Sequence, residues 1–114
     1  MSRFILGTIA ALLVAGTASA SEGSKATDAL KERIVKHCMA LKGLARNDCY
    51  ENFSLWIPDL YRAVGMDAGV HNIPAVINQC ERDEYVLEDL AEYPGDYPMT
   101  IVGCVVDGLR RSPK

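Results

Sequence analysis

The 114-residue sequence predicts an all-α protein, a small disulfide-stapled bundle of about four helices that follows a cleaved signal peptide. Two observations carry this prediction. Apolar residues recur three and four positions apart over most of the chain, which is the spacing of one helix face. Four cysteines occur in a short chain that begins with an export signal, a combination typical of a disulfide framework.

The N-terminal segment has the three parts of a signal peptide. Arg3 supplies the positive charge, residues 4–15 form an almost unbroken apolar run, and Ala18-Ser19-Ala20 fits the small-x-small rule for cleavage. The apolar run is shorter than the ~20 residues that cross a bilayer, and no later run is long enough, so we expect no stable membrane insertion. The expected divisions are a signal peptide over 1–20, a flexible leader over 21–26 and a single helical domain over 27–114.

The first two helices are expected on either side of Lys42-Gly43. Helical spacing of the apolar residues begins at Thr27 and ends near Lys42. Asp48 is followed three residues later by an acid, which is typical of a helix N-cap, and Gly65 is a natural stop. Pro58 should kink or break the second helix because it removes a backbone donor. Core positions are expected for its aromatic residues, which are Tyr50, Phe53, Trp56 and Tyr61.

The third helix should start at Asn72 and Pro74, a cap followed by a proline in the first turn. Asp83 can cap a fresh helix, so a bend is expected near residues 81–84. The expected inner stripe of this region is Val76, Ile77, Cys80, Leu87 and Leu90. Residues 93–98 hold two prolines and a glycine and form the strongest turn of the sequence. Helical spacing favours a helix over 99–109, although its β-branched residues leave a strand open.

The cysteines are expected to be structural. No C-x-x-C occurs, which argues against both a zinc site and thioredoxin-like redox chemistry. Four cysteines allow three complete pairings. Cys38 and Cys49 cannot bridge along one continuous helix, because eleven residues at ~1.5 Å each span about 16 Å and bridged Cα atoms lie within ~7 Å. A turn at Lys42-Gly43 makes a local bridge feasible.

The stretch from Cys38 to Glu51 resembles a short hairpin found in many bacterial envelope proteins. In that hairpin a cysteine is followed about ten residues later by Arg-x-x-Cys-Tyr-acid, which here is Arg46-Asn47-Asp48-Cys49-Tyr50-Glu51. The resemblance implies that Cys38 and Cys49 are bonded and that the protein belongs to a bacterial periplasm. The sequential pairing, with Cys80 bonded to Cys104, is therefore preferred, and the nested pairing of Cys38 with Cys104 and Cys49 with Cys80 stays open.

No catalytic, cofactor-binding or metal-binding constellation stands out. His37 and His71 are the only imidazoles, and His71 has too few neighbouring ligands for a metal site. The acidic series that contains Glu84 and Glu88 lacks a visible substrate cleft and suits an electrostatic surface for a basic partner. Tyr93, Asp96 and Tyr97 are expected in a rigid exposed turn that presents amphipathic rings to a protein. These five residues are the predicted partner-binding set.

The sequence thus predicts an exported, non-enzymatic protein-binding module, periplasmic or secreted, whose partner is another protein. A net charge of -3 without a basic stripe argues against nucleic acid as the partner. In size, export signal and cysteine pattern the chain is similar in outline to periplasmic immunity proteins that neutralise cell-wall-degrading effectors of type VI secretion. That resemblance implies an inhibitor or immunity-type role. The alternative is a structural or accessory subunit of an envelope assembly.

Overall fold

The computed structural model describes residues 22–112, which form a bundle of helices without a strand in that range. A first helix covers residues 22–40. It is followed by α2 (Gly43–Asp67), α3 (Ile73–Glu81), α4 (Glu84–Glu92), the short 3₁₀ turn η1 (Pro94–Asp96) and α5 (Tyr97–Arg110). The predicted all-α, disulfide-stapled bundle is confirmed. The predicted signal peptide over 1–20 lies outside the described residues.

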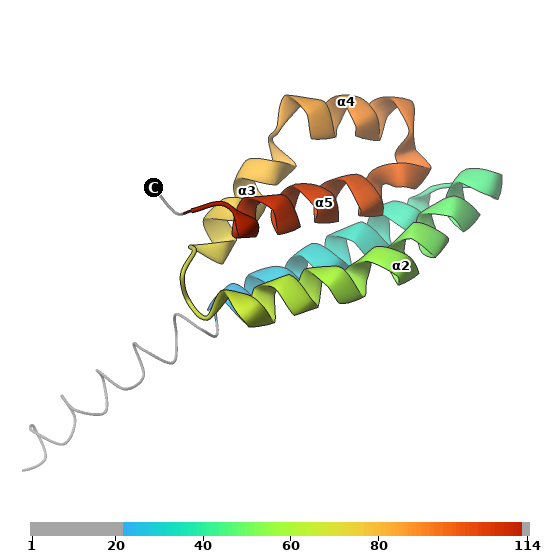
Figure 1. Ribbon diagram of the computed structural model, residues 1–114. Coiled ribbons are helices and arrows are strands. Elements are labelled where there is room, and N and C mark those ends of the chain that lie inside the picture. Colours follow the sequence, from blue (N-terminus) through green and yellow to red (C-terminus); the bar gives the residue numbers. More distant parts are fainter. Residues whose placement is uncertain (1–21, 113–114) are drawn as a thin grey trace, which may run out of the picture.

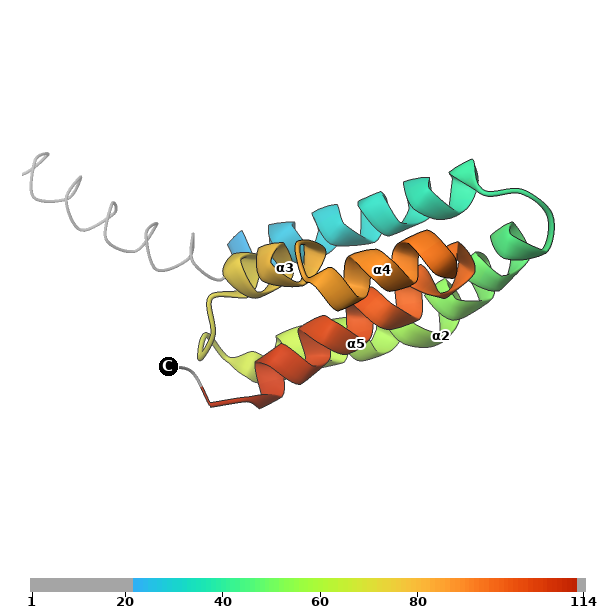
Figure 2. The ribbon, with the colours of Figure 1, turned by 90° about the horizontal axis from the view of Figure 1, so that it is seen from above.

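The first helix and α2 form a long antiparallel hairpin, and the other helices pack on it (Figure 1). α5 runs along α2 in the same direction and also contacts α3 and α4. α4 lies on the side of α5 that faces away from α2 (Figure 1). Seen from above, α3 and α4 follow each other along the length of the hairpin (Figure 2). α5 is therefore the central helix between α2 and α4.

The core is apolar and draws on every helix. Burial of these side chains is the main source of stability in a bundle, because isolated short helices are marginal in water. The fully buried members at its centre are Leu30, Ile34, Cys38, Cys49, Leu60, Ile101, Val102 and Val105. Ile77 and Val86, both 2% exposed, extend it to α3 and α4. The β-branched residues of α5 thus pack as a helix, and the strand alternative for 99–109 is wrong.

Both helices of the hairpin begin earlier than expected. Residues 22–26 belong to the first helix and not to a flexible leader. Gly23 is buried against Ile73, whose side chain would lie 3.2 Å from a Cβ at this position. Thr27 Oγ1 donates a hydrogen bond to the Gly23 carbonyl at 2.8 Å. α2 begins at Gly43, whose φ of 62° makes the sharp entry, so the expected cap at Asp48 lies inside the helix.

α2 also continues further than expected. It runs through Pro58 without a break and ends at Asp67, two residues after the expected stop at Gly65. The chain leaves the helix through Ala68 (φ 51°) and Gly69 (φ 79°), both in the left-handed region. A proline at an exposed position of a long, packed helix is tolerated because the contacts of the rest of the helix offset the lost hydrogen bond.

The predicted caps of α3 and α4 are confirmed. Asn72 Oδ1 accepts from the Ala75 N–H at 3.1 Å, and Asp83 Oδ1 accepts from the Val86 N–H at 3.2 Å. Each side chain satisfies a donor that the first helical turn leaves without a partner. The expected bend falls between Glu81 and Glu84, where α3 ends and α4 begins.

Two disulfides join the chain in the preferred sequential order. Cys38 and Cys49 are bonded with their Cα atoms 5.4 Å apart, and they close the tip of the hairpin. Cys80, at the end of α3, is bonded to Cys104 of α5 with a Cα separation of 5.9 Å. The nested pairing is therefore wrong, and all four cysteines are used.

Candidate protein-binding surface

α4 is fixed to the bundle along its inner side and at its start. Val86 is buried and Leu90 packs against the core, one helical turn apart. Asp89 accepts a hydrogen bond from the Thr100 hydroxyl of α5. Just before α4, the Cys80–Cys104 disulfide anchors the end of α3. The orientation of α4 is thus set by covalent, polar and apolar contacts together.

The residue that closes α3 is also held. Glu81 accepts two hydrogen bonds from Arg33 of the first helix, with Nε–Oε2 at 2.8 Å and Nη2–Oε1 at 2.6 Å. A bidentate pair of this kind fixes direction as well as distance. This ion pair therefore joins the first helix to the end of α3, directly before the bend that leads into α4. Nothing in the sequence around Glu81 predicts Arg33 as its partner.

The turn after α4 is locked into the hairpin. His37 Nε2 donates to the Pro94 carbonyl at 2.8 Å, and Asn52 Nδ2 donates to the Gly95 carbonyl at 3.0 Å. Gly95 is buried, and a Cβ there would lie 3.1 Å from the Ala45 carbonyl oxygen. The segment expected as an exposed loop is therefore a packed 3₁₀ turn, because only glycine allows α2 to approach so closely.

Tyr97 is buried and not presented on the surface. Its side chain is 9% exposed, and its ring meets His37 edge to face with centroids 4.8 Å apart. Burial raises the pKa of the Tyr97 phenol, and the nearby carboxylate of Glu81 adds to the effect. The expected exposure of Tyr97 is wrong, since the turn folds inward and places this ring in the core.

The outer side of α4 carries a row of carboxylates. Glu84, Glu88 and Glu92 are four positions apart, so they lie along one face of the helix, and all three are exposed. Tyr85, 71% exposed, and Leu87, 46% exposed, flank the row on its two sides. No lysine or arginine occurs between residues 83 and 109. We call these five side chains the α4 face.

The structure brings together three of the five predicted partner-binding residues. Glu84 and Glu88 lie on the α4 face, and Tyr93, 57% exposed, directly follows α4. Asp96 is half-buried at the start of α5, where its carbonyl accepts from Thr100 at 3.2 Å. It is the last residue of the packed turn and does not lie on the α4 face.

Three residues of the α4 face, Tyr85, Leu87 and Glu92, lie outside the predicted partner-binding set. The sequence pattern indicates no role for Tyr85, and it places Leu87 in the core, whereas both side chains are exposed. The expectation for Leu87 extended the stripe of α3 through the bend, whereas the break before α4 resets the helical phase and turns Val86 inward beside Leu90, which was expected there. The cap at Asp83 was the available signal, because a helix that begins afresh there need not continue the apolar stripe of α3.

His71 joins three segments at the opposite end of the bundle. Its Nδ1 lies 2.5 Å from Asp67 Oδ1 and its Nε2 lies 2.6 Å from the Arg111 carbonyl, while its backbone N–H donates to Asp67 Oδ2 at 2.9 Å. Both ring nitrogens face acceptors, an arrangement that only the protonated imidazole satisfies fully. The hydrogen bond to Asp67 raises the pKa of His71, and the Arg111 carbonyl adds to the shift. Within residues 22–112 no three potential ligands cluster as a metal would require.

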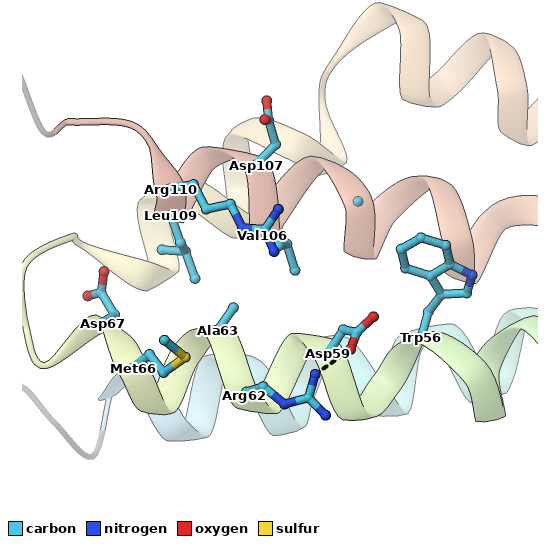
Figure 3. A pocket seen from close by; sticks show the side chains of 11 residues that line it. Trp56, Asp59, Arg62, Ala63, Met66, Asp67, Val106, Asp107, Leu109 and Arg110 are labelled. Atoms are coloured by element: carbon cyan, nitrogen blue, oxygen red, sulfur yellow. Dashed lines mark hydrogen bonds and ion pairs between the residues drawn. The ribbon is translucent and has the colours of Figure 1, made fainter.

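A groove of about 510 Å³ runs between α2 and α5 (Figure 3). Trp56 and Met66 of α2 and Leu109 of α5 line it, with Asp59 and Arg110 among its charged residues. Trp56 is thus only half-buried and does not fill the core as expected. Tyr50 and Tyr61, also expected inside, are 38% and 36% exposed. Leucine, isoleucine, valine and the disulfide cysteines make up most of the interior instead.

The described helices include none that is long and apolar enough to span a bilayer. No family model matches the chain, and no curated protein or solved structure shows significant similarity to it.

Proposed function

We propose that this chain is an exported, non-enzymatic protein-binding module and that its α4 face binds a cationic protein of the cell envelope. The observation that carries the proposal is the α4 face itself, three exposed glutamates with Tyr85 and Leu87 beside them. Carboxylates favour a basic partner and speed its approach, while an aromatic and an aliphatic side chain supply area that can be desolvated.

The rigid support of α4 favours binding. A disulfide and a capped bend precede the helix, and a packed turn follows it. A surface already held in its binding conformation loses little conformational entropy when a partner docks. The two disulfides agree with an oxidising compartment, since such bonds persist in periplasmic and secreted proteins. An inhibitor or immunity-type role is one in which a small, rigid, acidic binder acts by covering a basic surface.

The test is affinity capture from envelope and secreted proteins of the source organism. The key variant replaces Glu84, Glu88 and Glu92 by glutamine. A matched control replaces the exposed Glu22, Glu32 and Glu51 by glutamine, which changes the net charge by the same amount. Both are near-isosteric, so helicity should be unchanged.

We expect the wild type and the control to retain a basic protein, with retention falling as salt rises, and we expect the α4 variant to lose it. The proposal fails if nothing is retained, if the retained protein is acidic, or if both variants retain it equally. Equal loss in both variants would indicate a response to net charge and would also contradict the assignment to α4.

A further inference from the structure

One side of α2, at the edge of the groove, carries apolar residues that the rest of the described chain leaves exposed. Leu55 is 63% exposed and Met66 is 78% exposed. Between them lie Asp59 and Arg62, which form an exposed ion pair at 2.8 Å. The four residues are spaced by four, three and four positions, so they follow one another along a single face of the helix. Figure 3 shows Asp59, Arg62 and Met66 in this order along α2.

This stripe is complementary to itself when it is reversed. Its midpoint lies between residues 60 and 61, from which Leu55 and Met66 are equally distant, as are Asp59 and Arg62. In an antiparallel pair of α2 helices centred there, each Leu55 meets a Met66 and each Asp59 meets an Arg62. A two-fold symmetric contact requires such matching, because each residue must suit the residue that symmetry places opposite it.

We propose that α2 is a dimerisation helix, which pairs antiparallel with α2 of a second copy about a two-fold axis between residues 60 and 61. The pairing buries two apolar contacts and adds a second cation to each Asp59 carboxylate, so the four central charges alternate in sign. Trp56 and Ala63, which line the groove together with Asp59, Arg62 and Met66, lie beside the contact. Tryptophan, methionine and arginine are the residue types enriched in protein interfaces.

The dimer leaves the α4 face free. α2 and α4 lie on opposite sides of α5 (Figure 1), so two copies paired through α2 present two α4 faces outward. The inference uses none of the residues on which the proposed function rests, and either can fail without the other.

The test is sedimentation velocity over a concentration series, with the oxidised protein recovered from the periplasm of an expression host. We expect a concentration-dependent dimer. In a dimer of Asp59→Lys, each introduced lysine faces Arg62 of the other copy, and in a dimer of Arg62→Glu each introduced glutamate faces Asp59. Both variants thus place like charges opposite each other at two symmetric positions, so each should associate about tenfold more weakly or worse. An equimolar mixture of the two variants should recover the dimer. In the mixed dimer the introduced lysine lies opposite the introduced glutamate, and the remaining Arg62 lies opposite the remaining Asp59.

Leu44→Glu is the matched control for Met66→Glu. Leu44 is on the same helix and is 79% exposed. It lies outside the pairing, because it is eleven residues, or about 16 Å along the helix axis, from Leu55. Met66→Glu should weaken the dimer and Leu44→Glu should not, with unchanged circular dichroism in both. A protein that stays monomeric overturns the proposal, as does a dimer indifferent to the charge reversals. Failure of the mixture to associate overturns the antiparallel register, and binding of a different protein to this stripe overturns the choice of a second copy.

Discussion

The Cys80–Cys104 disulfide should hold α4 in place as well as stabilise the whole bundle. Its loop spans 24 residues and that of Cys38–Cys49 spans 11. In the chain-entropy account, loss of the longer bridge costs about 3.4 kcal/mol and loss of the shorter one about 2.8 kcal/mol near ~25 °C. The two losses are similar because closure entropy grows only with the logarithm of loop length. The two disulfides differ in their position in the fold, since only Cys80–Cys104 lies next to α4.

This difference gives a sharp comparison between C80A/C104A and C38A/C49A. Urea unfolding measures the global loss for each variant, and native-state hydrogen exchange measures the protection of individual amides. We expect similar global losses of about 3 kcal/mol. The amides of α4 should lose protection selectively in C80A/C104A, while C38A/C49A serves as a control of comparable stability.

A global loss below about 1 kcal/mol for either variant would contradict the entropic reasoning. Equal exchange of α4 in the two variants would refute the role of Cys80–Cys104 as the anchor of that helix. In that case the cap at Asp83 and the burial of Val86 would suffice to hold α4.

Three further outcomes are expected. His71→Gln should destabilise the protein most at pH values below about 6.5. The difference in unfolding free energy between wild type and variant should shrink as the pH rises through the raised pKa of His71, because the wild type also loses the contact of the protonated ring with Asp67 there. A constant difference from pH 5 to 9 would contradict this. Gly95→Ala should cost about 1–3 kcal/mol in urea unfolding, because its Cβ would press on the Ala45 carbonyl, and a neutral result would show that α2 yields. Asp83→Ala should cost about 1 kcal/mol through the lost cap, whereas Asp83→Asn should retain most of it; equal losses would argue against capping.

Local signals in the sequence predicted the parts of the fold that depend on local chemistry. The caps at Asn72 and Asp83 were predicted because a side-chain oxygen near the start of an apolar stripe satisfies orphan backbone donors. The helix over residues 99–109 followed from apolar spacing despite its β-branched residues. The residues left the disulfide pairing open, and the resemblance of one hairpin pointed to the bridge that the structure contains.

Tertiary contacts decided the features that were mispredicted. Nothing near Gly23 in the sequence shows that Ile73 packs against it and extends the first helix. The burial of Tyr97 depends on the docking of η1 and on His37, which lies 60 residues earlier in the chain. The inward side of α4 depends on where the helical phase restarts, and carrying the stripe of α3 across the expected bend wrongly placed Leu87 in the core. Composition identified the acidic segment, but only packing could identify its exposed side.

Zero-length carbodiimide cross-linking of the captured complex, read by mass spectrometry, tests the central claim most directly. The reagent joins a carboxylate only to an amine in contact with it. The account predicts isopeptide bonds from Glu84, Glu88 and Glu92 to lysines of the partner. Cross-links confined to carboxylates of the hairpin, such as Glu32 and Glu51, would contradict it and place the binding surface elsewhere.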